Sequence, residues 1–153
     1  MSELKTCTDT VDNFYISAIN DSNMNGRSSY VLKTSRKMAR MAINMDQNYP
    51  HKNPSQHEPA YFDGMHKRCT GWKTLTLWVY HNASRKLLRL ATMEVKGETS
   101  ENVALFWRLF NEVLAEVKGE PGYQFNPCGW ITDEAGANFN GIGMVYGCLL
   151  YTS

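Results

Sequence analysis

The feature that most constrains the fold is an apolar stripe with helical spacing in the second half of the chain. Its six large side chains lie three or four residues apart, except for one adjacent pair: Val103, Phe106, Trp107, Phe110, Leu114 and Val117. Thr99 or Ser100 can cap the first turn through a side-chain hydroxyl. Gly119 and then Pro121 stop the pattern, which predicts a helix over residues 100–117. Such a stripe needs a sheet to pack on.

Alternating residues before the predicted helix supply the strands of this sheet. Residues 73–81 and 86–95 alternate between two faces and are joined by a four-residue turn, which predicts an antiparallel hairpin. Residues 60–63 and 130–132 are expected to be short strands, and residues 135–147 a second helix weakened by its glycines. The expected order is a three-strand antiparallel meander, a helix, a strand parallel to the first and a final helix. This is an α/β fold with helices on a mixed sheet.

The sequence before the first of these strands has a different character. Residues 1–26 are rich in Asn, Asp, Ser and Thr, contain one apolar cluster within residues 14–19, and are expected to be weakly structured. Residues 22–45 carry five positive side chains and no acid, and a helical face begins after Thr34 or Ser35. Residues 46–59 contain three prolines, which predicts a linker or an irregular loop.

The basic helix has two interpretations. Arg36, Lys37 and Arg40 could lie on DNA, or they could form the solvated face of an ordinary amphipathic helix. The net charge of +1 excludes a polycation, so any nucleic-acid contact must come from a local patch of this kind. We expect no membrane span, because the apolar runs are only a few residues long. Four cysteines without a CxxC pair favour reduced thiols over a disulfide framework or a zinc module.

Two acids occupy the ends of expected strands. Asp63 ends the first strand and Asp133 ends the fourth. If these strands are parallel neighbours, both carboxylates reach the same edge of the sheet, where open α/β sheets bind ligands. Two carboxylates held close repel each other, and a magnesium ion with its preference for oxygen ligands relieves the repulsion. Alternatively, Asp63 is a turn former and Asp133 an ordinary helix N-cap.

Both acids lie in motifs that resemble a known family. Residues 61–66 (YFDGMH) resemble the first catalytic motif of Mutator-like element transposases. Residues 130–133 (WITD), with Ala137, Ile142 and residues 145–147 downstream, resemble the family's second acidic motif, and the resemblance covers roughly residues 59–147.

The resemblance implies a partial ribonuclease-H-like fold and a DDE-type transposase, which cleaves DNA and transfers strands. It implies Asp63 and Asp133 as catalytic residues and as ligands of Mg²⁺ (or Mn²⁺). It also implies transposon ends and target DNA as partners, a nuclear location and a homo-oligomer as one possible assembly. His66, which ends the first motif, and Lys67 and Arg68, which follow it, are expected to contact the DNA.

The family's third acid, a Glu well after the second Asp, has no counterpart here. Glu134 is the one acid after Asp133, and Glu98 matches a family position before the helix. Residues 148–153 (CLLYTS) read like a translated sequencing adapter. We therefore expect an N-terminal segment (1–58), the first part of a transposase domain (59–147) and a non-native tail (148–153). We expect this chain to be inactive by itself. The alternative is a transposon-derived, non-enzymatic DNA-binding or chromatin-interaction protein.

Overall fold

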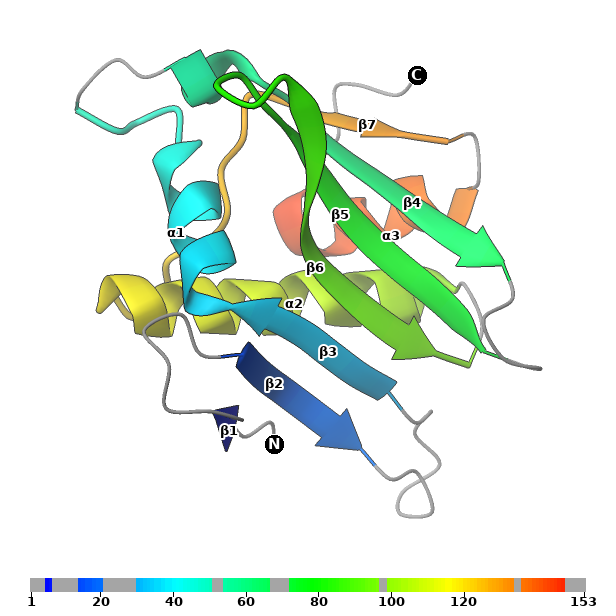
Figure 1. The fold of residues 1–153 in the computed structure, drawn as a ribbon. Coiled ribbons are helices and arrows are strands. Elements are labelled where there is room, and N and C mark those ends of the chain that lie inside the picture. Colours follow the sequence, from blue (N-terminus) through cyan, green and yellow to red (C-terminus); the bar gives the residue numbers. More distant parts are fainter. Residues whose placement is uncertain are drawn as a thin grey trace.

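The computed structural model describes residues 5–6, 14–20, 30–50, 54–66, 72–96, 99–133 and 136–147. This part of the chain forms an α/β fold in which α-helices pack on one mixed sheet (Figure 1). The elements in chain order are β1 (Lys5–Thr6), β2 (Phe14–Asn20), β3 (Tyr30–Ser35), α1 (Arg36–Asn44), a short 3₁₀-helix (Pro54–His57), β4 (Ala60–His66), β5 (Lys73–His81), β6 (Lys86–Val95), α2 (Ser100–Lys118), β7 (Trp130–Thr132) and α3 (Gly136–Tyr146). The strand order in the sheet is β1-β2-β3-β6-β5-β4-β7.

Strands β4, β5 and β6 form the antiparallel meander that the sequence predicts, and β7 lies parallel to β4. The bounds of β5, β6 and β7 match the predicted ranges, whereas β4 continues beyond Asp63 to His66. The connection from β6 to β7 runs through α2, as a crossover to a parallel strand requires.

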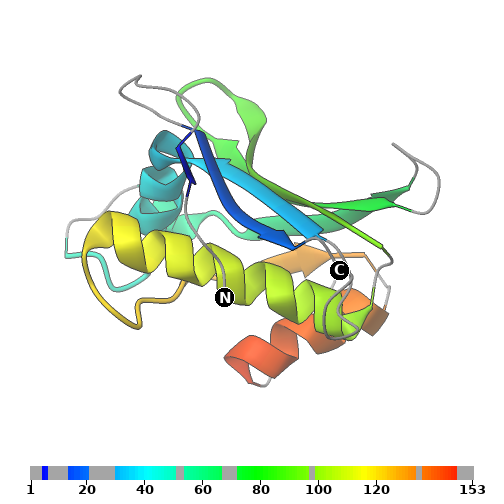
Figure 2. The ribbon, with the colours of Figure 1, turned by 90° about the horizontal axis from the view of Figure 1, so that it is seen from below.

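Helix α2 lies across one face of the sheet and α3 packs beside it on the same side (Figure 2). The Thr99 hydroxyl accepts a hydrogen bond from the Asn102 amide at 3.1 Å, and Gly119 ends the helix in the left-handed conformation with φ 75°. Phe106 and Trp107, both fully buried, have ring centroids 5.0 and 5.1 Å from that of Phe62 on β4. The predicted stripe thus forms the core between helix and sheet.

The expectation that residues 1–26 are weakly structured is wrong for residues 14–20. These residues form β2, which pairs with β3, and β3 in turn pairs with β6. The physical reason is that β6 would otherwise be an edge of the meander with unpaired backbone groups. Leu32 of β3 is fully buried, so this strand completes the core as well as the hydrogen-bond ladder.

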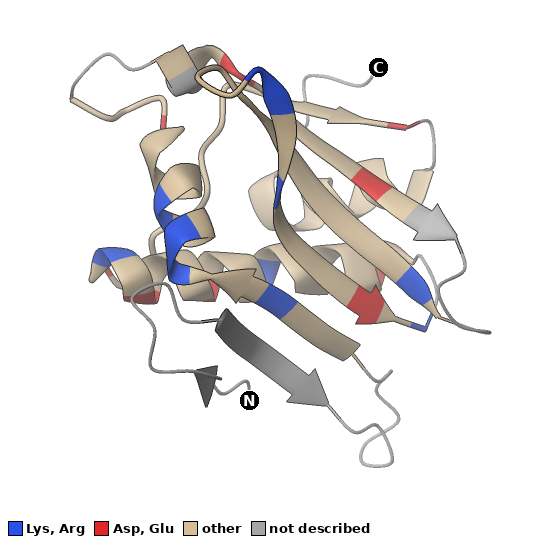
Figure 3. Cartoon of the chain, in the orientation of Figure 1, with Lys and Arg blue, Asp and Glu red and all other residues tan. Residues whose placement is uncertain are grey.

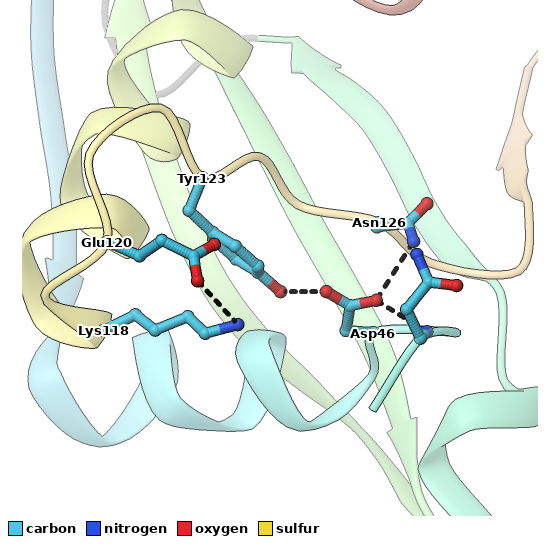
Figure 4. Close-up of polar contacts among 6 residues, drawn as sticks. Asp46, Lys118, Glu120, Tyr123 and Asn126 are labelled. Carbon is cyan, nitrogen blue, oxygen red and sulfur yellow. Dashed lines mark hydrogen bonds and ion pairs between the residues drawn. The ribbon is translucent and has the colours of Figure 1, made fainter. Parts of the chain in front are cut away.

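Residues 46–50 form an anchored loop and not a free linker (Figure 4). The buried carboxylate of Asp46 accepts hydrogen bonds from the Asn48 amide at 2.8 Å, the Asn126 side chain at 3.0 Å and the Tyr123 hydroxyl at 2.6 Å. Tyr123 and Asn126 belong to the connection between α2 and β7. We call Asp46, Asn48, Tyr123 and Asn126 the Asp46 clasp; it fixes the loop before β4 to the segment before β7.

Candidate functional site

The parallel pairing of β4 and β7 places the two candidate acids on neighbouring strands. The register pairs Tyr61 with Ile131 and Phe62 with Thr132. Asp63 and Asp133 each follow the last of these pairs by one residue. Side chains alternate along a strand, and Phe62 is buried towards α2, so Asp63 lies on the opposite face of the sheet, which we call the outer face. Asp133 directly follows the last residue of β7, and both acids are exposed.

A groove on the outer face contains both acids. It has a volume of about 360 Å³ and is lined by Tyr61, Phe62, Asp63, Trp78, Leu87, Ile131, Thr132 and Asp133. Trp78 lies beside Tyr61 in the β4–β5 pairing, and Leu87 of the hairpin is 50% exposed despite its apolar side chain. The acids therefore lie in a recess with one apolar wall, and not on a flat charged surface.

Hydrogen bonds orient both carboxylates. Asp63 Oδ1 accepts from the Gly64 backbone N–H at 2.8 Å, and Asp133 Oδ1 accepts from the side-chain amide of the buried Asn138 at 2.8 Å. Helix α3 begins at Gly136, and Asn138 in its first turn holds the carboxylate of Asp133.

The chemistry of the pair fits magnesium. Mg²⁺ is commonly held by one or two carboxylates while waters and substrate phosphates complete its octahedron. Two oriented carboxylates at adjacent register positions provide such a partial set. Within the described residues, no group of three or more His, Cys, Asp and Glu side chains could hold a metal ion. The two acids are therefore better suited to a metal ion that also binds a phosphate than to a structural metal ion whose ligands all come from the protein.

Of the remaining predicted site residues, those that the structure describes do not line this groove. His66 ends β4, but its side chain lies outside the described residues, as do Lys67, Arg68, Glu98, Glu134 and residues 148–153. Arg36, Lys37 and Arg40 lie on α1, where the side chains of Lys37 and Arg40 are exposed. Ser35 caps this helix by accepting from the Met38 amide at 3.1 Å, which confirms the predicted start.

Sequence reasoning missed three residues of the site. Asn138 is fully buried and holds Asp133, and its only sequence signal is a short amide side chain in the first turn after the acid. Trp78 lines the groove and is only partly buried, and nothing in the alternation of residues 73–81 marks it as a site residue. Leu87 carries no local signal, because its position depends on the path of the hairpin.

Comparison with protein-family models, with curated proteins and with solved structures finds no match to this chain. Among the described helices, none combines the length and the apolar character needed to span a bilayer.

Proposed function

We propose that the chain carries the first part of a ribonuclease-H-like catalytic domain of a DDE-type transposase. The single observation that carries this proposal is the parallel register of β4 and β7, since it brings Asp63 and Asp133 together. The antiparallel meander, the helix α2 and the return strand parallel to the first follow the element order that the motifs suggest. Such a protein acts on DNA in the nucleus.

Asp63 and Asp133 would hold Mg²⁺ or Mn²⁺ between them and a DNA phosphodiester. The bound ion supplies electrostatic stabilisation of the charge that develops on the phosphate and activates the attacking water or hydroxyl. The Gly64 N–H and the Asn138 amide orient the carboxylates before substrate arrives. Trp78 and Leu87 form an apolar wall on one side of the groove.

Metal binding is the direct test of the site. Manganese binding to the purified chain should be measured by electron paramagnetic resonance, with magnesium as competitor. We expect Asp63→Asn and Asp133→Asn each to weaken binding by about tenfold or more, because one of two charged ligands is lost. Glu116→Gln removes an exposed acid on α2 and is the matched control. Equal manganese binding by all four proteins would refute the proposed site.

A nicking assay on supercoiled plasmid tests activity separately. We expect no cleavage by this chain with Mg²⁺ or Mn²⁺, because only two acids match the family's three catalytic positions. Cleavage that Asp63→Ala abolishes would overturn this expectation and would show that the described acids suffice.

A second candidate is a non-enzymatic DNA-binding role for α1. Ala39 and Ala42 are fully buried, whereas Lys37 and Arg40 on the same helix are exposed, so its basic side faces away from the core. Salt-dependent DNA affinity that falls when Arg36, Lys37 and Arg40 are replaced by Gln, without any effect of metal or of Asp63→Asn, would favour this role.

A further inference from the structure

One row of residues crosses the outer face from the candidate acids to the basic side of the molecule. Asp63 pairs with Thr76, Thr76 with Thr92, and Thr92 with Lys33. Paired residues share a face, so these four side chains lie on the outer face in one line perpendicular to the strands. Neighbouring strands are about 4.8 Å apart, which puts Lys33 roughly 14 Å from Asp63 across β5 and β6.

Helices α2 and α3 lie on the other side of the sheet, and within the described residues no helix covers the outer face (Figures 1 and 2). Along the row, Asp63 and Lys33 are exposed, whereas Thr76 between them is buried. In Figure 3, basic residues lie on β3, α1 and β6, and acidic residues lie on β4, on β7 and near the end of β6. This face therefore carries charges of both signs, with the two candidate acids on the side of β4 and β7.

A second groove lies at the Lys33 end of this row. It has a volume of about 280 Å³, and its lining includes the cations Lys33 and Arg89, which are both exposed, and Ser35 at the start of α1. One acid, Glu94, also lines it, but its carboxylate accepts a short hydrogen bond of 2.6 Å from the Thr74 hydroxyl. The lining of this groove thus contains two exposed cations and one carboxylate.

Arg89 reaches this position through an irregularity in β6. The β5–β6 register shifts between the pairs Leu77–Ala91 and Trp78–Arg89, leaving Leu90 as the extra residue. Leu90 and Ala91 are both buried, so the bulge returns Arg89 to the outer face opposite Trp78. The Arg89 guanidinium carbon lies 5.3 Å from the centre of the Trp78 ring. This cation–π contact holds the guanidinium over the Trp78 ring.

Trp78 connects the two grooves. Its ring lines the groove of the acids, and its partner Arg89 lines the basic groove. Tyr61 and Tyr80 lie on the same outer face and are also half-buried aromatic side chains. Aromatic side chains beside a line of cations are the combination with which proteins bind unpaired nucleic-acid strands, since bases stack on rings while cations contact phosphates.

From this arrangement we propose that the outer face binds a single DNA strand, with Lys33 and Arg89 on its phosphates and Tyr61 and Trp78 at its bases, and leads it to Asp63 and Asp133. The inference rests on the proposed function for the reaction at the acids. The observations that support the binding surface itself are the two grooves and the bulge in β6. Trp78 is a positioning residue for Arg89 as well as a contact for bases.

The test is the affinity of the full chain for labelled oligothymidine, measured by fluorescence anisotropy in EDTA at several salt concentrations. We expect Arg89→Gln and Lys33→Gln each to lower the affinity about threefold to tenfold at low salt and to reduce the salt slope by about 0.7. Arg108→Gln removes an exposed cation on α2, on the other side of the sheet, and should change neither quantity. Circular dichroism should show that all three variants are folded.

Two further measurements make the assignment specific. Trp78→Leu should weaken binding although it removes no charge, and Trp78→Phe should restore most of the affinity because a ring remains under Arg89. Oligothymidine should bind more tightly than a duplex.

Equal affinity for single strand and duplex, or equal effects of Arg89→Gln and Arg108→Gln, would overturn the proposal. Because the assay contains no metal, this failure is distinct from a failure of manganese to bind Asp63 and Asp133.

Discussion

The Tyr123 hydroxyl donates a hydrogen bond of 2.6 Å to Asp46 Oδ2, across 77 positions of sequence (Figure 4). Both residues are buried, and the contact joins the loop before β4 to the segment before β7. These two strands are the ones whose far ends carry Asp63 and Asp133. The clasp therefore helps to fix the register on which the candidate site depends, from the opposite end of the strands.

Tyr123→Phe should destabilise the protein, because it leaves the buried Asp46 carboxylate without one of its donors. We expect a loss of about 1–3 kcal/mol in the free energy of unfolding, measured by urea denaturation. Tyr80→Phe removes a hydroxyl from a half-buried tyrosine of β5 and is the matched control. Similar losses in both variants would argue against a special role for the clasp.

The stability contributed by Asp46 should depend on pH. Burial alone would raise the pKa of Asp46, but hydrogen bonds from Tyr123, Asn48 and Asn126 and the charge of Lys118 outweigh it, so the pKa lies below its ordinary value of 3.8. A lowered pKa in the folded state means that this stabilisation is present above pH 3.8 and is lost as the pH falls through the folded value.

Asp46→Asn is the variant that tests this dependence. It should be less stable than the natural chain at neutral pH, and the difference in unfolding free energy should shrink below about pH 4. Urea titrations at a series of pH values measure it. A difference that stays constant down to pH 2 would contradict the prediction.

The packing of α3 on α2 predicts opposite effects for two glycines of one helix. A Cβ at Gly141 would collide with the Val103 side chain and lie 2.8 Å from the Ser100 carbonyl oxygen, whereas a Cβ at Gly143 meets nothing within 4 Å. Gly141→Ala should therefore cost about 1–3 kcal/mol through overpacking. Gly143→Ala should stabilise the helix by up to about 1 kcal/mol. Thermal unfolding of the two variants, measured side by side, shows whether the first is destabilised and the second is stabilised.

The parts of this structure that sequence predicts well are those determined locally. The stripe from Val103 to Val117 and the alternation of residues 73–81 specify α2 and β5 almost to the residue, because each pattern reports burial on one side of one element. The parallel placement of β7 beside β4 follows from the helical crossover between them.

The parts that were missed depend on distant partners. Strand β3 forms because β6 offers an open edge, and the bulge that turns Arg89 outward exists only in the pairing of β6 with β5. The clasp between Asp46 and Tyr123 is likewise invisible until the chain is folded. In the candidate site, the two acids could be predicted from strand ends, while Asn138 and Trp78 could not.

The negative charges of Asp63 and Asp133 and those of a bound DNA strand repel each other, which leads to a last prediction. Without metal, Asp63 and Asp133 repel each other and a nearby phosphate, so Asp63→Asn should raise the affinity for oligothymidine in EDTA by about twofold to fivefold at low salt. With Mg²⁺ bound, the same substitution removes a metal ligand, and the affinity should fall below that of the natural chain. Anisotropy titrations of both proteins with and without Mg²⁺ measure this reversal. Glu116→Gln, which removes an equal charge from α2, should show no reversal, because α2 lies on the other side of the sheet (Figure 2). If Asp63→Asn shifted the affinity in the same direction under both conditions, the acid would act only as a surface charge and not as a metal ligand beside the strand.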